Sequence, residues 1–346
     1  MRMKTMSTNP TVELLIPVYK PGEELAALLK YMKKQTYPLQ AIRLLVTAGE
    51  KQYEKICETY RVTDGCLRDE NHNGCVLEDV VLRFTRIDPS AFDHGGTRHL
   101  GASQSTADIL LFMTQDAVPE NEHLVEEIVK AFAWENAMAA DGDGLSGQQP
   151  VIAAAYARQL PAVDCNFIEQ YTRQFNYPAQ SCVKTKTDLS KLGIKTYFCS
   201  NVCAAYRRDV YEKLGGFERR TIFNEDMIFA AGLIQAGYGI AYAADARVIH
   251  SHNYSGLQQL HRNFDLAVSQ AEHPEIFEAV PSEGEGIRMV KSTAAYLCKC
   301  GKAYLVPKLV WQSGCKYLGY LLGKRYRKLP KKLVLWLTMN KRYWRE

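Results

Sequence analysis

The chain has 346 residues and is 47% hydrophobic, which is enough to bury a large core and excludes a disordered protein. Its formal net charge of +5 is unevenly placed. Residues 301–346 contain twelve Lys/Arg and one Glu, a charge of +11, so the rest of the chain carries −6. The basic character therefore belongs to one terminal segment and does not indicate a nucleic-acid partner for the chain as a whole.

The ten cysteines show neither CxxC pairs nor a regular spacing, which predicts free thiols in a reducing, cytoplasmic compartment. Cys199 and Cys203 lie within apolar runs, where a buried thiol is the ordinary interpretation. Glu13 interrupts the only N-terminal run that resembles a signal peptide, and no stretch reaches about 18 apolar residues. We therefore expect neither a signal peptide nor a membrane-spanning helix.

Short apolar runs alternate with helical patterns along the chain. Strands are expected at 12–18, 42–47, 80–87, 107–114 and 151–156, and helices at 23–35, from about 51, and near 121–134. Connections of this kind predict an α/β fold with a mostly parallel sheet flanked by helices. Two polar, turn-rich stretches, 62–79 and 134–150, are interpreted as surface loops.

The carboxyl ends of parallel strands share one edge of the sheet, where the crossovers leave a crevice for ligands. Pro17, Val18 and Tyr19 close the first strand at this edge, and Thr47 closes the second. These residues are therefore candidates for contact with a bound ligand.

The stretch 92–119 adds a pattern suited to phosphate. His94, Gly95 and Gly96 let the backbone approach a ligand closely, Thr97 can cap a helix, and Arg98 follows in its first turn, where amides and a guanidinium can meet a phosphate. A Gly pair is also common in ordinary turns, so this pattern is weak when taken alone.

A metal site is expected at the same edge. The next strand delivers Gln115 and Asp116, and Asp116 supplies an oxygen ligand for Mg²⁺ or Mn²⁺, although it can also serve as a helix cap. His250 and His252 are two residues apart in an extended segment, so they point the same way, and one of them can complete the site.

A pair of carboxylates opens a helix far along the chain. Glu225 and Asp226 precede the apolar positions of that helix, so both project from its N-terminal end. Acids at a helix start are commonly there for capping and for the helix dipole. The alternative is a catalytic carboxylate facing the sheet edge.

These motifs together resemble a known family. Residues 12–255, about two thirds of the chain, resemble a family 2 glycosyltransferase of the GT-A type with its Rossmann-like sheet. The motifs FDHGGTR, TQDA, RQLP, FNYP, SNVCAAYRRDVYEKLGGF, NEDM and HSHNYS are similar to its bacterial rhamnosyltransferase branch. The resemblance implies an inverting enzyme that transfers L-rhamnose from dTDP-L-rhamnose to a cell-surface polysaccharide or a lipid-linked oligosaccharide.

The resemblance also implies roles for single residues. Asp116 matches the last acid of the DXD metal motif, although Thr114 stands at its first position, and Asp226 of NED matches the catalytic base, with Glu225 on the acceptor side. The implied donor-binding residues are Pro17, Val18, Tyr19, His94, Gly95, Gly96, Arg98, Gln115 and Asp116, and the implied metal ligands are Asp116, His250 and His252.

Three alternatives stay open. After the second strand the family has an Asp/Ser-rich loop that touches the donor base, whereas this chain has VTAGEKQYEK, so a UDP- or GDP-linked sugar is possible. A nucleotidyltransferase would carry a Gly-rich phosphate loop directly after strand 1, where this chain has PVYKPGEEL. A non-catalytic sugar-binding protein would be expected to have lost Asp226 or the histidines.

We divide the chain into a transferase domain at 10–265 and a helical, basic C-terminal region at 266–346. Within that region, residues 316–346 interleave apolar and aromatic side chains with Lys/Arg, which is typical of a helix at an anionic membrane surface. A basic helix packed on the domain and a nucleic-acid patch are the alternatives. We expect a peripheral protein at the inner face of the cell membrane that binds no nucleic acid.

Overall fold

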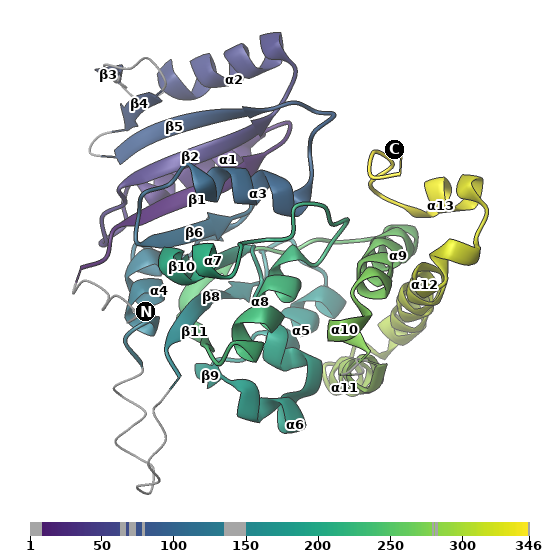
Figure 1. Cartoon of the computed structure of the whole chain (residues 1–346). Helices are drawn as coiled ribbons and strands as arrows, with labels where there is room; N and C mark the ends of the chain where they lie inside the picture. Colours follow the sequence, from purple (N-terminus) through teal and green to yellow (C-terminus); the bar gives the residue numbers. More distant parts are fainter. Residues whose placement is uncertain are drawn as a thin grey trace, which may run out of the picture.

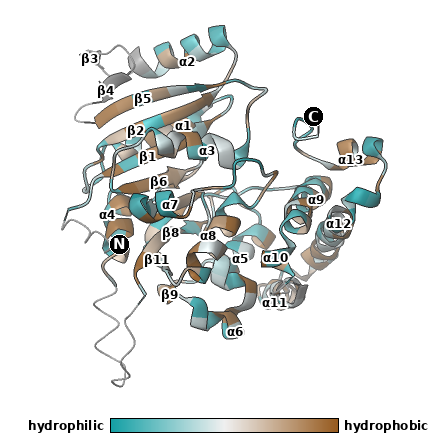
Figure 2. Cartoon of the chain, viewed as in Figure 1, coloured by the Kyte–Doolittle hydropathy of each residue, from teal (hydrophilic) through white to brown (hydrophobic). Residues whose placement is uncertain are grey.

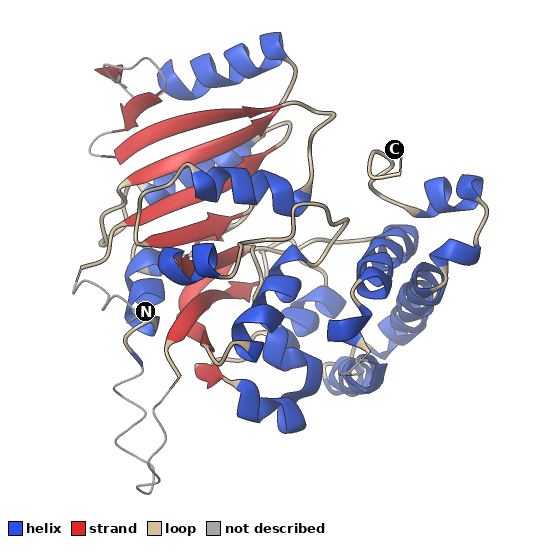
Figure 3. Ribbon diagram, viewed as in Figure 1, coloured by secondary structure: helices blue, strands red, loops and turns tan. Residues whose placement is uncertain are grey.

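The computed structural model describes residues 9–62, 67–68, 74–77, 80–134, 150–278, 280 and 283–344. A twisted sheet has helices on both faces, and residues 256–344 form a pack of helices beside it (Figures 1 and 3). The predicted loop at 134–150 lies almost wholly outside the described residues. In the predicted loop at 62–79, the described residues include two short strands that extend the sheet edge.

The strands form one sheet in the order β3-β4-β5-β2-β1-β6-β10-β8-β11-β7, with β9 paired to β11. They are β1 (Val12–Val18), β2 (Ala41–Thr47), β3 (Leu67–Arg68), β4 (Gly74–Leu77), β5 (Val80–Ile87), β6 (Ile109–Met113), β7 (Val118–Pro119), β8 (Ile152–Leu160), β9 (Cys182–Lys184), β10 (Cys203–Arg207) and β11 (Gly239–Ile249). Neighbours among β5, β2, β1 and β6 pair in parallel, and so do β8 and β11. Strand β10 is antiparallel to both β6 and β8, so β8 again runs with β6. The predicted mostly parallel sheet is confirmed, with β10 reversed inside it.

Two helical layers cover the sheet. On one face lie α1 (Glu23–Met32), α2 (Glu50–Val62) and α4 (Leu124–Ala131), and on the other lie α3 (His94–Ser103), α7 (Arg208–Lys213) and α8 (Glu225–Gln235). In β1, Leu14 and Ile16 belong to the first core and Leu15 to the second, as the alternation of side chains along a strand requires. The central strands are accordingly hydrophobic along most of their length (Figure 2).

The remaining helices are α5 (Phe167–Asn176), α6 (Leu189–Leu192), α9 (Gly256–Glu272), α10 (Pro274–Phe277), α11 (Glu283–Lys299), α12 (Val306–Lys324) and α13 (Lys331–Leu337). Helices α9 and α12 pack at very close range, because a Cβ placed on Gly319 would lie only 2.1 Å from the carbonyl oxygen of Leu260. No side chain larger than hydrogen fits at that crossing.

The basic tail is folded onto this helical pack. Val334 and Leu337 of α13 are buried in one cluster with Leu260 and Phe264 of α9, and the backbone N–H of Met339 donates to the Asp265 carboxylate at 2.8 Å. Residues 316–346 are thus not one continuous surface helix; the alternative of a basic helix packed on the domain describes their burial better. The predicted boundary at 265/266 falls inside α9, and the division into two domains stays a prediction.

Among the described residues, no helix is both long and apolar enough to cross a membrane. Eight cysteines whose side chains the structure describes are free thiols, and Cys199 and Cys203 among them are buried as predicted.

Candidate active site

The ends of β1 and β6 are joined by a two-way hydrogen bond at the carboxyl edge of the sheet. The backbone N–H of Tyr19 donates to Gln115 Oε1 at 2.9 Å, and Gln115 Nε2 donates to the carbonyl of Tyr19 at 3.1 Å. Pro17 and Val18 form the end of β1 just behind, and Val18 is buried. Tyr19 is 49% exposed, so its side chain is accessible to a ligand at this edge.

Asp116 and the two histidines lie together as predicted from the strand ends. Asp116 follows β6, and His250 and His252 follow β11. The Asp116 Oδ2 atom is 3.6 Å from His250 Nε2 and 3.5 Å from His252 Nε2, and one ligand atom from each residue falls within 4.8 Å of the other two. This is the size of a single metal site.

A second layer of polar groups holds His250 in position. Its Nδ1 atom lies 3.1 Å from Gln159 Oε1, and Gln159 Nε2 donates to Ser200 Oγ at 3.1 Å. Arg173 also donates to Gln159 Oε1. A proton on His250 Nδ1, donated to Gln159, leaves the lone pair of Nε2 facing Asp116 and free to bind a metal.

The charge states of this cluster suit metal binding. Burial alone would raise the pKa of Asp116, but the hydrogen bond and charge of His250, together with His252, hold it well below its usual range. Burial, and then the neighbouring His250, lowers the pKa of His252 to about 4. The carboxylate is therefore ionised and the His252 imidazole neutral at physiological pH, as ligands must be.

The two acids at the start of α8 have different partners. Glu225 is buried, and its carboxylate lies 3.1 Å from Arg98 Nη1 and accepts from Asn201 Nδ2 at 3.3 Å. Asp226 accepts from the backbone N–H of Asn201 at 3.1 Å and from that of Met227 at 2.8 Å. The adjacent acids thus have different charged and backbone partners, with Asn201 bonded to both.

These partners separate the two acids electrostatically. Burial opposes ionisation of Glu225, but the Arg98 guanidinium, and then His94, keep its pKa below the usual value. Burial, and then the charge of Glu225, raises the pKa of Asp226 to about 7. A carboxylate that takes up a proton near neutral pH is suited to act as a general base.

The segment 92–98 is built differently from the expected phosphate loop. The side chain of Asp93 caps α3 by accepting from the backbone N–H of Gly96 at 2.8 Å, so the expectation that Thr97 is the cap is wrong. Helix α3 begins at His94, so Arg98 lies beyond its first turn, and Thr97 is buried within the helix. A Cβ on Gly95 would lie 1.9 Å from the carbonyl oxygen of Glu218, so this glycine permits contact with the chain's own backbone.

Three further residues bear on the site although the sequence pattern did not single them out. Asn201 contacts both acids of α8, and Gln159 orients His250. The Arg262 guanidinium of α9 lies over the rings of Phe223, at 4.7 Å, and Tyr254, at 5.7 Å, and its charge lowers the pKa of His252. Asn201 lies in a quoted motif, so it could have been found; Arg262 has no local signal, because only the placement of α9 brings it here.

Comparison with known proteins gives similarities of three kinds: to a family, to curated relatives and to solved structures. The family described as "Glycosyl transferase family 2" matches residues 86–215. The O-antigen chain rhamnosyltransferase RfbN of Salmonella typhimurium is 37% identical over 96% of both chains, and the O-antigen chain rhamnosyltransferase WbaN of Salmonella anatum is 43% identical over 97% of this chain and 96% of its own. The mannosyltransferase PcManGT from Pyrobaculum calidifontis, solved in complex with GDP-Man and Mn²⁺, is 15% identical with a TM-score of 0.57, covering 93% of this chain and 89% of its own.

The fold is the GT-A fold of glycosyltransferases. The similarity to RfbN and WbaN extends over nearly the whole chain at more than one third identity. The chain belongs to glycosyl transferase family 2, and it is an enzyme.

Proposed function

We propose that the enzyme transfers L-rhamnose from dTDP-L-rhamnose to a cell-surface polysaccharide or a lipid-linked oligosaccharide, with inversion at the anomeric carbon. The observation that carries this proposal is the 37% and 43% identity, over nearly the full chain, to two proteins named as O-antigen chain rhamnosyltransferases. A UDP- or GDP-linked sugar is the alternative donor, because the stretch after β2 lacks the Asp/Ser-rich pattern of the family.

In this proposal Asp226 is the catalytic base. Its carboxylate takes the proton from an acceptor hydroxyl while that oxygen attacks the anomeric carbon, opposite the departing diphosphate. Glu225 stays ionised against Arg98 and keeps the pKa of Asp226 raised. Glu225 and Arg98 then act through Asp226. His94 also lowers the pKa of Glu225, and the close packing of Gly95 and Gly96 fixes the position of the start of α3.

Asp116, His250 and His252 would hold the divalent metal. One carboxylate oxygen and two imidazole nitrogens within 4.8 Å fit one ion and leave coordination positions for diphosphate oxygens. A set with two nitrogens is unlike the all-oxygen sets that Mg²⁺ prefers, so of Mg²⁺ and Mn²⁺ we favour Mn²⁺. Such an ion supplies Lewis-acid stabilisation of the charge on the leaving group.

The donor lies in this proposal along the ends of β1 and β6. Tyr19 and Gln115, with Pro17 and Val18 behind them, line the nucleoside side. The Arg262 guanidinium, held over two aromatic rings beside the histidines, is placed to neutralise the departing diphosphate. The guanidinium of Arg98 is buried against Glu225, so in this proposal Arg262, and not Arg98, neutralises the diphosphate.

We place the enzyme at the cytoplasmic face of the membrane. Helix α12 exposes Val310, Trp311, Tyr317 and Leu318, which lie on one side of the helix at the spacing of its turns. The +11 charge of residues 301–346 complements anionic lipid. A surface of this composition supports peripheral binding near a lipid-linked acceptor.

A transfer assay tests the proposal. Purified enzyme is incubated with dTDP-L-rhamnose, UDP-glucose or GDP-mannose and an oligosaccharide acceptor, with Mn²⁺ or with EDTA, and the released nucleotide is measured. We expect dTDP release only with dTDP-L-rhamnose and metal. Turnover with another donor would replace the donor assignment, release of pyrophosphate would indicate nucleotidyl transfer, and no turnover with any donor would favour a sugar-binding protein.

A further inference from the structure

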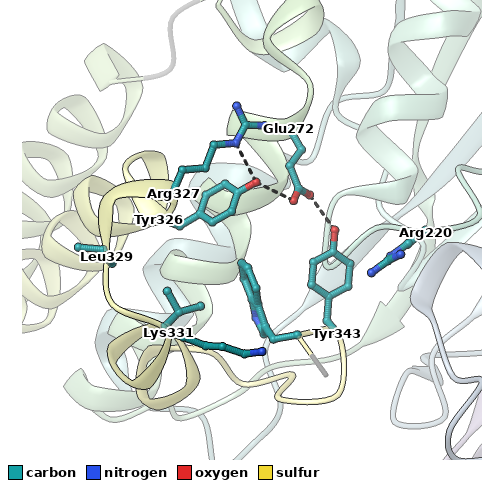
Figure 4. A pocket seen from close by; sticks show the side chains of 9 residues that line it. Arg220, Glu272, Tyr326, Arg327, Leu329, Lys331 and Tyr343 are labelled. Carbon is teal, nitrogen blue, oxygen red and sulfur yellow. Dashed lines mark hydrogen bonds between the residues drawn. The ribbon is translucent and has the colours of Figure 1, made fainter. Parts of the chain in front are cut away.

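A cavity of about 500 Å³ lies at the end of α9. Its walls come from α9, the turn Tyr326–Lys328, α13 and the C-terminal residues, with Arg220 entering from the loop before α8 (Figure 4). Arg220 and α9 lie far from the tail segments in the sequence, and the tertiary fold brings them together. None of the roles assigned above uses this cavity.

The lining is cationic. Arg220, Arg327 and Lys331 line the cavity, and Glu272 is its single acid. The Glu272 carboxylate is already bonded: it accepts from Tyr326 Oη at 3.1 Å and from Tyr343 Oη at 2.9 Å, as Figure 4 shows. Glu272 therefore connects two tyrosines of the cavity wall. With three cations and one acid, the lining residues carry a net charge of +2.

The wall also contains an unused hydrogen-bond donor. The indole Nε1 of Trp344 is buried and has no hydrogen-bond partner among the described residues. Burying an unpaired donor is unfavourable, so an acceptor supplied by a ligand would relieve it. Guanidinium, ammonium and indole donors around one cavity suit the oxygens of a phosphate group, which accept several such bonds at once.

An apolar surface adjoins this basic pocket. Helix α13, which supplies Lys331 and Val334 to the lining, exposes Leu333 (37%) and Trp336 (54%), and Met339 follows at 54%. A ligand with a phosphate and a hydrocarbon chain would match both parts, the phosphate in the pocket and the chain along α13. A free phosphate would match the pocket alone.

We propose that this basic pocket, lined by Arg220, Arg327, Lys331 and Trp344, binds the phosphate group of a lipid at the membrane surface. The inference deepens the proposed function, since a lipid-linked acceptor carries such a group. The pocket would then fix how the enzyme sits on the membrane, whereas the net charge of the tail only attracts it.

Two double variants of equal charge test this. Arg327→Ala/Lys331→Ala removes two lining cations, and Lys328→Ala/Lys332→Ala removes their sequence neighbours, which are exposed and do not line the pocket. All four side chains are exposed, so both variants should keep the wild-type melting temperature. Binding of submicellar dodecyl phosphate and of inorganic pyrophosphate is measured by calorimetry on the full chain without donor.

We expect dodecyl phosphate to bind wild type and the Lys328/Lys332 variant within about twofold of each other, and the Arg327/Lys331 variant about tenfold more weakly or worse, because two charge-assisted bonds are lost. Pyrophosphate should bind more weakly than dodecyl phosphate. Equal losses in both variants, no binding to wild type, or pyrophosphate binding as tightly as dodecyl phosphate would each overturn the lipid assignment. Since no donor is present, these outcomes are independent of whether rhamnose is transferred.

Discussion

Acids are buried near both ends of the parallel strands, but the partners of these acids differ. Near the amino end of β1, Glu13 is fully buried, lies 2.9 Å from Arg43 Nε and accepts from Ser105 Oγ at 2.7 Å. Arg43 is bonded further to Gln104, so every charge in this cluster has partners inside the protein. At the carboxyl edge, Glu225 is buried against Arg98, but its neighbour Asp226 is left with a raised pKa.

The difference separates a paired structural acid from the acid that we propose as the catalytic base. Both edges contain an Arg–Glu pair in a buried setting, so burial and pairing alone do not mark a site. The carboxyl edge adds a second acid beside the pair, and this acid accepts from two backbone donors while Arg98 pairs with Glu225. The pKa of Asp226 therefore lies near neutrality, as the proposed role of general base requires.

Asp226→Asn tests the reactive end and should have the largest effect. It removes the base while keeping the shape, so we expect the transfer rate to fall about 10²- to 10⁴-fold with donor binding nearly unchanged. Transfer is measured by nucleotide release and donor affinity by calorimetry. A rate close to that of wild type would move the base elsewhere, with Glu225 next in line.

Glu13→Gln tests the structural end. It leaves the Arg43 cation buried without its counter-charge, which should lower the free energy of unfolding by about 3–5 kcal/mol. Urea denaturation should show a lower midpoint with an unchanged slope. The folded fraction should keep the wild-type pH profile of transfer; an altered profile would mean that the two edges are coupled.

The metal cluster can be removed piece by piece. Asp116→Ala should weaken metal-dependent dTDP binding about tenfold or more, and His250→Ala and His252→Ala should weaken it less, since each leaves the charged ligand in place. Calorimetry with Mn²⁺ and with EDTA decides this. If EDTA does not change the affinity, the site is metal-independent and Arg262 carries the diphosphate.

The pH profile gives the smallest but most specific effect. Asp226 must be ionised to accept a proton, and its pKa is raised to about 7, so the transfer rate should rise with pH through neutrality and level off above it. Glu225→Gln removes a charge that raises this pKa and should move the rise to lower pH. Glu212→Gln, the same change at an exposed acid paired with Arg208, is the control and should leave the profile in place. Identical profiles in all three proteins would contradict the assignment of Asp226.

Much of the site could be predicted because its residues follow strand and helix ends. Asp116 and the His250/His252 pair end strands that run in the same direction, so their meeting follows from the topology. The start of α8 at Glu225 likewise follows from the apolar spacing behind it. The function of the 92–98 segment did not follow in the same way, because local spacing does not reveal that Gly95 faces the Glu218 carbonyl or that Arg98 faces Glu225.

The sequence by itself determined the positions of β1, β2, β5, β6 and β8, the mostly parallel sheet and the candidates at its carboxyl edge, because hydrophobic periodicity and strand ends are local properties. Tertiary structure alone decided which acid is paired and which has a raised pKa, since that depends on Arg98 and Asn201 reaching α8 from distant segments. It also decided the fate of the basic tail. Interleaved charges and aromatic residues predict a surface helix, but Val334 and Leu337 are buried against α9, and such long-range packing leaves no trace in local composition.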